Sequence, residues 1–280
     1  MTRAKTFRSW QSGVALVAVL WVVAALSILV SGLVETQREE IRIATSARTR
    51  QFADAVGQAA IHLAVQGMLA ETRPLGRLVR RNFLYEGLEI QVEIQPLSGM
   101  VDLNLAPGPL LAELYAIGGG LERSVADRLA AATVASREAT PPEAPVRFQA
   151  PEDLLSVPGI DYDLYARLAP LVTTESQGTG RVNPLAAIQR VLILLTAGDE
   201  ALASRLAADR DANLPGIDTT RINGAFIDSS ESSRFRFMAS VPVPDGSLVL
   251  VARDIDTSPA TEAMAPWRTL RKYAPLTSLK

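Results

Sequence analysis

The longest apolar run of the chain lies near its N-terminus. Residues 14–34 contain no charged side chain, and this length matches the about 20 residues that a helix needs to cross the hydrocarbon core of a bilayer. The apolar region of a cleaved secretory signal is shorter, about 7–15 residues. The pattern therefore favours a transmembrane helix over an ordinary cleaved signal.

The segment after this run predicts a long helical continuation. Residues 35–71 contain no proline, and apolar residues recur there at intervals of three and four. Those positions are Phe52, Ala55, Val56, Ala59, Leu63 and Ala64. We expect the membrane helix to continue outward as an amphipathic helix through residues 35–73 and to end at Pro74.

Two regions that lie far apart in the sequence predict strands of one sheet. Leu88–Gln95 alternates apolar and polar residues, which is the period of a half-buried strand. Phe235–Val243 and Leu248–Ile255 flank the sequence Pro-Asp-Gly-Ser, which is typical of a hairpin turn. We expect residues 74–97 and 218–280 to form a small antiparallel sheet.

Residues 98–217, between these strands, predict an inserted helical domain. Two short helix pairs, each joined by a glycine turn, are expected around Gly118–Gly120 and Gly159, and a further apolar helix at Pro184–Ala197. Asn104 and Asn183 lie in two loosely matching segments and are expected at helix starts or turns. The predicted fold class is α+β: a long N-terminal helix packed on a small antiparallel sheet, with a large inserted all-α domain.

Composition excludes several classes of site. The chain has no cysteine, its one histidine is His62, and no Gly-Lys pair occurs. Thiolate metal sites, two-histidine zinc motifs and a Walker A phosphate loop are therefore absent from the sequence. No acid–base pair stands out, so we do not expect an enzyme, and His62 is interpreted as a packed or interface residue on the apolar side of the long helix.

Two pairs of carboxylates are the remaining candidates for a metal site. Asp161 with Asp163, and Asp254 with Asp256, lie two residues apart. Carboxylate oxygens at this spacing contribute to calcium sites when loop carbonyls join them, although neither pair fits the twelve-residue EF-hand loop. Plain surface solvation is the alternative, and we favour it for both pairs.

The second glycine turn, at Gly159, lies in a pattern that binds nucleic acid in other proteins. The sequence Leu-Ser-Val-Pro-Gly-Ile at 155–160, followed by an amphipathic segment, is typical of a helix–hairpin–helix, whose turn presents backbone N–H groups to DNA phosphates in other proteins. Residues 152–172 carry four acidic side chains and one basic side chain, Arg167. This charge repels a polyanion, so helix packing or protein docking is favoured and nucleic acid is not expected as a partner.

The N-terminus resembles a known family of membrane proteins. A basic leader with Arg3, Lys5 and Arg8 precedes Ser12-Gly13, and the apolar run follows at once. This arrangement resembles type IV prepilin-like proteins. The resemblance implies that prepilin peptidase cuts between Gly13 and Val14, that the new amino terminus is methylated, that leader 1–13 is cytoplasmic, and that the head is periplasmic on a single-pass inner-membrane helix.

Further features narrow the resemblance to the K-type minor pseudopilins of type II secretion systems. They are the length of the chain, the inserted helical domain, and Ala18 at the fifth mature position, where most members carry glutamate. The resemblance implies minor pseudopilins of the I and J types as partners and a place at the tip of the periplasmic pseudopilus. Related proteins often bind calcium. Ala131–Thr140 departs from the acidic-aromatic stretch expected of the family.

One alternative from another class remains open at this stage. A membrane-anchored component of DNA uptake would also combine an apolar N-terminal helix with helix–hairpin–helix pairs. A true phosphate binder would shift DNA in a gel at low salt and lose affinity steeply as the salt concentration rises.

The first prediction concerns processing. Replacing Gly13 with a bulky residue is expected to leave a precursor that retains residues 1–13 and to abolish secretion, because the peptidase requires the small residue before the cut. Mass spectrometry of the membrane form measures this directly. A wild-type protein that begins at Met1 would contradict it.

Overall fold

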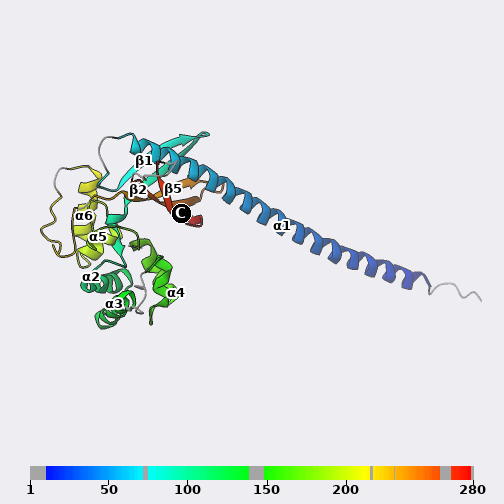
Figure 1. The fold of residues 1–280 in the computed structure, drawn as a ribbon. Coiled ribbons are helices and arrows are strands. Elements are labelled where there is room, and N and C mark those ends of the chain that lie inside the picture. The colour runs from blue at the N-terminus through cyan, green and yellow to red at the C-terminus, as the bar shows by residue number, and fades with distance from the viewer. Residues whose placement is uncertain are drawn as a thin grey trace, which may run out of the picture. The chain divides into compact units, whose positions relative to one another are not determined.

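The chain divides into two units. The computed structural model describes residues 11–71, 75–138, 148–214, 217–229, 231–258 and 266–278, and the side chains of all of these except 11–15, 28–42 and 277–278. Contacts within the chain separate residues 1–52 from residues 53–280. Helix α1 (Gln11–Leu69) forms the described part of the first unit and continues into the second (Figure 1). It ends at Leu69, before the expected stop at Pro74.

An antiparallel sheet is the centre of the second unit. Its strand order is β1-β2-β5-β6-β7, and β8 also pairs with β6. The strands are β1 (Val79–Tyr85), β2 (Leu88–Pro96), β5 (Arg234–Pro242), β6 (Leu248–Asp256), β7 (Arg268–Lys272) and β8 (Leu276–Ser278). The predicted strand at Leu88–Gln95 and the predicted hairpin are present as β2, β5 and β6, which confirms the α+β class.

Strand β1 was not expected from the sequence. It pairs with β2 through a two-residue turn in which Glu86 has φ 49° and Gly87 has φ 79°. Positive φ at both central residues defines the type I′ turn, which matches the right-handed twist of the two strands. The Glu-Gly pair before an alternating strand was therefore the signal for this hairpin.

Helix α1 packs on one face of the sheet through small side chains. Its buried residues are Ala53, Val56, Ala60, Ile61, Ala64, Val65 and Met68, and they contact strand residues such as Ile90, Val92, Phe237 and Val251. Gly57 lies so close that an added Cβ would sit 2.6 Å from Cγ2 of Val251. Small residues allow this approach of helix and sheet, so the helix face is set by size as well as by hydrophobicity.

The predicted apolar stripe of α1 was wrong in part. Val56 and Ala64 are buried, but Phe52 and Leu63 are 45% and 42% exposed and Ala55 is also exposed. His62 is exposed rather than packed in the core, and its ring lies 6.0 Å from that of Trp267. The predicted stripe leaves out Ala53, Gly57 and Ala60, which lie close to the sheet.

The segment between β2 and β5 forms a helical insertion with its own apolar core. Its helices are α2 (Gly108–Glu113), α3 (Arg123–Glu138), α4 (Tyr162–Leu168), α5 (Gln189–Leu195) and α6 (Glu200–Asp211), with short helical turns η1 (Leu97–Gly99), η2 (Leu114–Gly118), η3 (Pro151–Ser156) and η4 (Ala169–Leu171). Figure 1 shows α2 to α6 grouped together.

Two expectations for the insertion need correction. It is not purely helical, because β3 (Val101–Asp102) and β4 (Val172–Thr173) form a short parallel pair. Helix α5 begins at Gln189 instead of Pro184. The side-chain oxygen of Asn183 accepts a hydrogen bond from the backbone N–H of Leu185, so the chain forms a turn there before the helix starts.

The second prediction tests the core of the insertion. Leu192 on α5 is 1% exposed within this core, and Leu192→Asp buries an unpaired charge, so we expect a loss of about 3 kcal/mol or more in the free energy of unfolding. Chemical unfolding followed by circular dichroism measures it.

Leu214→Asp is the matched control. Leu214 lies just beyond α6 and is 47% exposed, so the same change there is expected to alter stability by less than about 0.5 kcal/mol. Equal unfolding of the Leu192 variant and the wild type would show that α5 is not part of the core.

Candidate functional site

The N-terminal candidates lie in helix α1. The backbone at Gly13 and Val14 is helical, while their side chains and leader residues 1–10 lie outside the described part of the chain. Ala18 is exposed on the same helix. Among the residues that the structure places, we find no helix long and apolar enough to cross a membrane. The expected span at 14–34 includes 14–15 and 28–34, whose side chains are not described.

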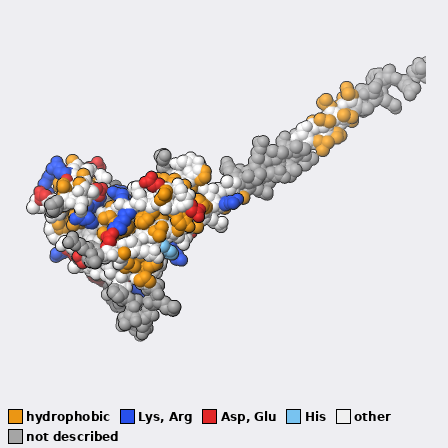
Figure 2. Space-filling model, turned by 90° about the horizontal axis from the view of Figure 1, so that it is seen from above, with side chains coloured by type: hydrophobic (Ala, Val, Ile, Leu, Met, Phe, Trp, Pro, Cys, Tyr) orange, Lys and Arg blue, Asp and Glu red, His pale blue; other side chains and the backbone are white. Residues whose placement is uncertain are grey.

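The described side chains of this part of α1 are strongly apolar and uncovered. Leu16, Val17, Val19, Leu20, Trp21, Val22, Val23 and Leu26 are between 55% and 73% exposed. Figure 2 shows this apolar segment of the helix at the molecular surface. A contiguous apolar surface of this kind on a soluble protein marks a site of contact with lipid or with other chains.

The first pair of calcium candidates, Asp161 and Asp163, lies at the start of helix α4. Asp161 caps the N-terminus of α4, where its Oδ1 accepts a hydrogen bond of 2.7 Å from the backbone N–H of Leu164. Asp163 follows in the first turn of the helix and is exposed. Ser, Thr, Asn and Asp at this position satisfy backbone donors that the helix leaves free. Capping and solvation therefore account for this pair.

Asp254, in the second candidate pair, faces an arginine on the neighbouring strand. Arg236 donates from Nε to Oδ1 at 2.8 Å and from a terminal nitrogen to Oδ2 at 2.9 Å. The hydroxyl of Tyr273 donates to Oδ2 at 2.7 Å, and its ring lies 4.8 Å below the guanidinium. Paired, charge-assisted bonds of this kind are among the strongest hydrogen bonds in proteins.

Asp256 is held in a comparable way two residues further along β6. Nε of Arg234 donates to Oδ2 at 3.1 Å, and Arg268 lies 3.5 Å from the same oxygen. The backbone N–H and hydroxyl of Ser258 donate to Oδ1. Burial raises the pKa of Asp256, but the bonds from Ser258 and the charge of Arg234 outweigh it and hold this pKa below its ordinary value.

Donors from the protein satisfy the carboxylates of this second pair. All four oxygens of Asp254 and Asp256 accept hydrogen bonds from protein groups. In the described residues, no group of three or more histidine, aspartate or glutamate side chains is arranged to hold a metal ion. The pairing was missed because Arg234 and Arg236 precede the turn and the two aspartates follow it. The register of the hairpin sets Arg234 opposite Asp256 and Arg236 opposite Asp254.

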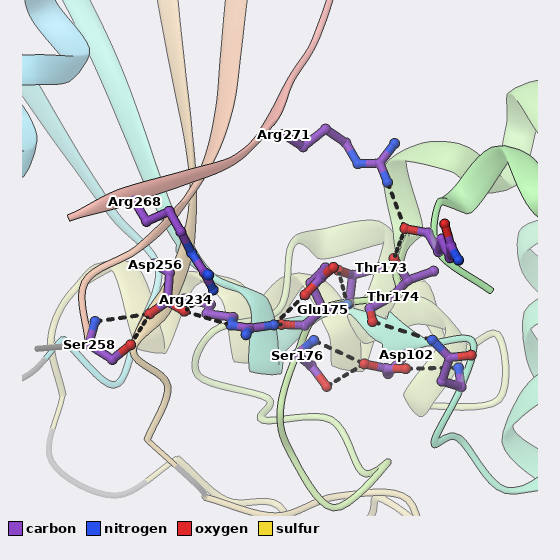
Figure 3. Close-up of polar contacts among 12 residues, drawn as sticks. Asp102, Thr173, Thr174, Glu175, Ser176, Arg234, Asp256, Ser258, Arg268 and Arg271 are labelled. Carbon is purple, nitrogen blue, oxygen red and sulfur yellow. Dashed lines mark hydrogen bonds and ion pairs between the residues drawn. The ribbon is translucent and has the colours of Figure 1, made fainter. Parts of the chain in front are cut away.

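Arg234 also joins the sheet to the helical insertion (Figure 3). A terminal nitrogen of Arg234 donates to the backbone carbonyl of Glu175 at 3.1 Å and also contacts the Glu175 carboxylate. The next residue, Ser176, donates its N–H and hydroxyl to the buried carboxylate of Asp102 at 2.9 and 2.6 Å. These contacts join the sheet to β3 and to the segment after β4. We call this polar cluster the junction; its residues are Asp102, Glu175, Ser176, Arg234 and Asp256.

A second contact of the junction involves strand β7. Arg271 donates to the carboxylate of Glu152 at 2.9 Å and to the backbone carbonyl of Gln149 at 3.1 Å. Gln149 precedes η3 in the insertion, and Glu152 lies in its first turn. The sheet therefore contacts the insertion through arginines from two strands, β5 and β7.

The two loosely matching segments of the insertion pack against each other. A Cβ on Gly99 would lie 2.1 Å from the carbonyl oxygen of Ala186, and a Cβ on Gly180 would lie 2.1 Å from that of Leu105. The backbone N–H of Asn183 also donates to the carbonyl of Ser98 at 2.7 Å. Asn183 and Asn104 both lie at turns, as expected. The side-chain amide of Asn104 also bonds both the N–H and the carbonyl of Phe148.

The glycine turns of the two helix pairs are also used for packing. Gly119 is buried, and a Cβ there would sit 2.8 Å from Cδ1 of Leu164 on α4. Gly159 has φ +94°, and its Cβ would lie 3.0 Å from Leu129 on α3. Arg167 adds a bond of 3.1 Å from Nε to the carbonyl of Gly119. Each turn therefore contacts the other helix pair, which supports the packing interpretation over phosphate binding.

The third prediction concerns the pH dependence of the junction. The pKa of Asp256 is lowered in the folded state, so its stabilising effect is complete above the unfolded pKa, about 3.9, and is lost as the pH falls through the lower folded value. We expect Asp256→Asn to cost about 3 kcal/mol at pH 7, because Arg234 stays buried without this partner, and clearly less at pH 3.

Urea unfolding of both proteins at the two pH values measures this difference. Glu231→Gln, at an exposed position outside the helices and strands, is the control and is expected to change stability by less than about 0.5 kcal/mol at both. A cost of Asp256→Asn that does not depend on pH would contradict the assignment.

Comparison with known proteins finds a likeness among solved structures. No protein-family model matches the chain, and no curated protein matches it. Among solved structures, the chain is similar to one chain of the GspK–GspI–GspJ complex from the type 2 secretion system of enterotoxigenic Escherichia coli. Sequence identity is 14%, the TM-score is 0.49, and the match covers 86% of this chain and 100% of that chain.

Proposed function

We propose that this protein is a K-type minor pseudopilin of a type II secretion system. Prepilin peptidase would cut between Gly13 and Val14, and residues 14–34 would anchor the mature chain in the inner membrane with the head in the periplasm. The protein would join minor pseudopilins of the I and J types and initiate or cap the pseudopilus. Its role is structural, without a catalytic step.

The exposed apolar surface of α1 carries this proposal. Eight large apolar side chains between Leu16 and Leu26 are each more than half exposed. At about 25 cal/mol per Å² of apolar surface, such a surface is stable only in lipid or against other apolar helices. Both environments are provided when a pilin-like subunit passes from the membrane into a filament. A prepilin-type leader directly before this surface agrees with that route.

The part of α1 in the second unit offers a further contact face. Ala55 and Leu63 are exposed while Ala53, Ala60 and Ala64 pack on the sheet. Leu69, near the end of the helix, is 40% exposed. Residues at helical spacing on the side away from the sheet form an apolar edge that neighbouring helices can cover.

Ala18 supports a position at the tip. By the resemblance, glutamate at the fifth mature position pairs with the free amine of the subunit above it. A tip subunit has no such neighbour, and an unpaired carboxylate in lipid costs about 2.5–3.5 kcal/mol at a helix centre. Alanine avoids this cost, while the amine of Val14 stays available to the subunit below.

The fourth prediction places the protein in the filament. Site-specific crosslinking of the full chain in assembled pseudopili is expected to give I- and J-type neighbours below it and none above. Ala18→Glu is expected to allow incorporation along the shaft, because the new carboxylate can pair with an amine. Ala24→Glu puts the same charge elsewhere on α1 and serves as the control, with no shaft incorporation expected.

Two results would contradict this proposal. Wild-type protein crosslinked along the shaft, with neighbours both above and below, would exclude the tip position. Absence of any crosslink to I- or J-type pseudopilins in assembled filaments would exclude the pseudopilin role itself.

A further inference from the structure

A cavity of about 420 Å³ lies where the chain enters the sheet, beside the end of helix α6. Arg77 and Arg80 line it from the segment that leads into β1, and Arg210, Asp211 and Asn213 line it from α6 and the residues after it. Leu75, Leu78 and Val79 form its apolar wall. The cavity is separate from the junction and from the apolar surface of α1.

The positive charges around this cavity outnumber the negative ones. The Asp211 carboxylate bridges Arg210, at 2.7 Å, and Arg80, at 3.1 Å. Arg80 also pairs with Glu93 at 2.8 Å. Burial raises the pKa of Asp211, but the bonds and charges of the two arginines outweigh it and lower this pKa, so the carboxylate is ionised at neutral pH. Three guanidinium groups thus share two carboxylates.

Of these three arginines, Arg77 pairs with neither Asp211 nor Glu93. Its contact in the described residues is a hydrogen bond to the amide oxygen of Asn213, and no carboxylate of the described chain pairs with it. An amide oxygen accepts the hydrogen bond but does not neutralise the charge. Asn213 has φ +56°, a left-handed conformation that ends α6 and places its amide beside the cavity.

Arg210 is a buried arginine in the wall of the cavity, and hydrogen bonds hold its guanidinium in place. Its residue is 3% exposed, Nε is bound to Asp211, and a terminal nitrogen donates to the backbone carbonyl of Ala187. A guanidinium that is already ordered loses little conformational freedom when an anion binds near it. The segment that carries Arg77 is also fixed, because the Asn183 amide donates to the carbonyl of Gly76 at 3.0 Å and the N–H of Leu78 donates to the carbonyl of Leu185 at 3.0 Å.

We propose that this cavity binds a carboxylate group carried on a short apolar stem, with Arg77 as its principal partner. The planar fork of arginine matches a carboxylate in two parallel hydrogen bonds. The apolar wall of Leu75, Leu78 and Val79 suits the methylene groups of such a ligand, and the volume admits a side chain or a small acid. The carboxylate comes either from an acidic side chain of a partner protein or from a free dicarboxylic acid.

Isothermal titration calorimetry of the full chain in detergent micelles tests this. The probes are glutarate, a capped peptide containing one glutamate, and inorganic phosphate, all at an ionic strength held constant with chloride. Binding of glutarate or the peptide is expected for the wild type, and about tenfold or greater weakening for Arg77→Gln. Arg221→Gln is the matched control, because Arg221 pairs with Asp199 at an exposed position outside the cavity.

The arms of the experiment separate the sources of the carboxylate. Tighter binding of the peptide than of glutarate assigns the site to a partner chain, and the reverse assigns it to a free acid; either supports the proposal. Binding of phosphate alone, no heat with any probe, or equal affinity of wild type and Arg77→Gln would overturn it. Arg77 is half-buried, and its hydrogen bond within the described residues is to an amide. Unchanged thermal melting of its variant is therefore expected and excludes misfolding as the cause.

Discussion

Arg234 and Arg236 lie at the start of β5, where the helical insertion meets the sheet, and each is largely removed from water. Arginine keeps its charge at every accessible pH, so each guanidinium requires a carboxylate within reach. Asp256 and Asp254 provide these only when β5 and β6 pair in the observed register. A slip of one residue would move both aspartates to the other face of the sheet. The two ion pairs thus fix the register of the hairpin, and through Glu175 they also fix the attachment of the insertion.

The sequence predicted those elements whose signal is local. Alternation was enough for β2 and for the β5–β6 hairpin, because one face of each strand contacts α1. Strand β1 carries Arg80, Arg81 and Asn82, whose polarity hides the alternation. The start of α5 was misplaced because Pro184 and Leu185 read as helical, while the Asn183 side chain stabilises a turn there.

The contacts of the candidate site depend on residues far apart in the sequence, so local patterns do not predict them. The aspartates two apart were visible in the sequence, but their partners precede the turn and are recognised only once the register is known. The buried face of α1 was also misjudged, because its close approach to the sheet depends on Gly57 and alanines, which contribute little to a hydrophobic pattern. The cavity beside Arg77 is formed by two segments, 75–80 and 210–213, that meet only in the folded chain.

Glycine has two different roles in the insertion, and the difference bears on function. Gly99, Gly119 and Gly180 allow backbones to approach where any Cβ would collide with a carbonyl or a leucine. Gly120 and Gly159 adopt positive φ in the turns. Gly119 is buried against α4, whereas Gly159 is exposed and a Cβ there would lie 3.0 Å from Leu129 on α3. Both turns thus contact the opposite helix pair, so the two pairs stabilise each other, and we favour packing as the role of the repeated motif.

The two units of the chain differ in the kind of specificity that they can supply. Apolar side chains of α1 between Leu16 and Leu26 offer surface that is non-directional, and any apolar helix or lipid of similar shape can cover it. Charged groups in fixed geometry, by contrast, select partners and set register, because a mismatched charge is costly. Ion pairs use many of the described charges of the second unit, as in the junction. Arg77 differs in lining a cavity without a carboxylate partner in the described residues, so it can select an acidic group, while α1 would supply association without such selection.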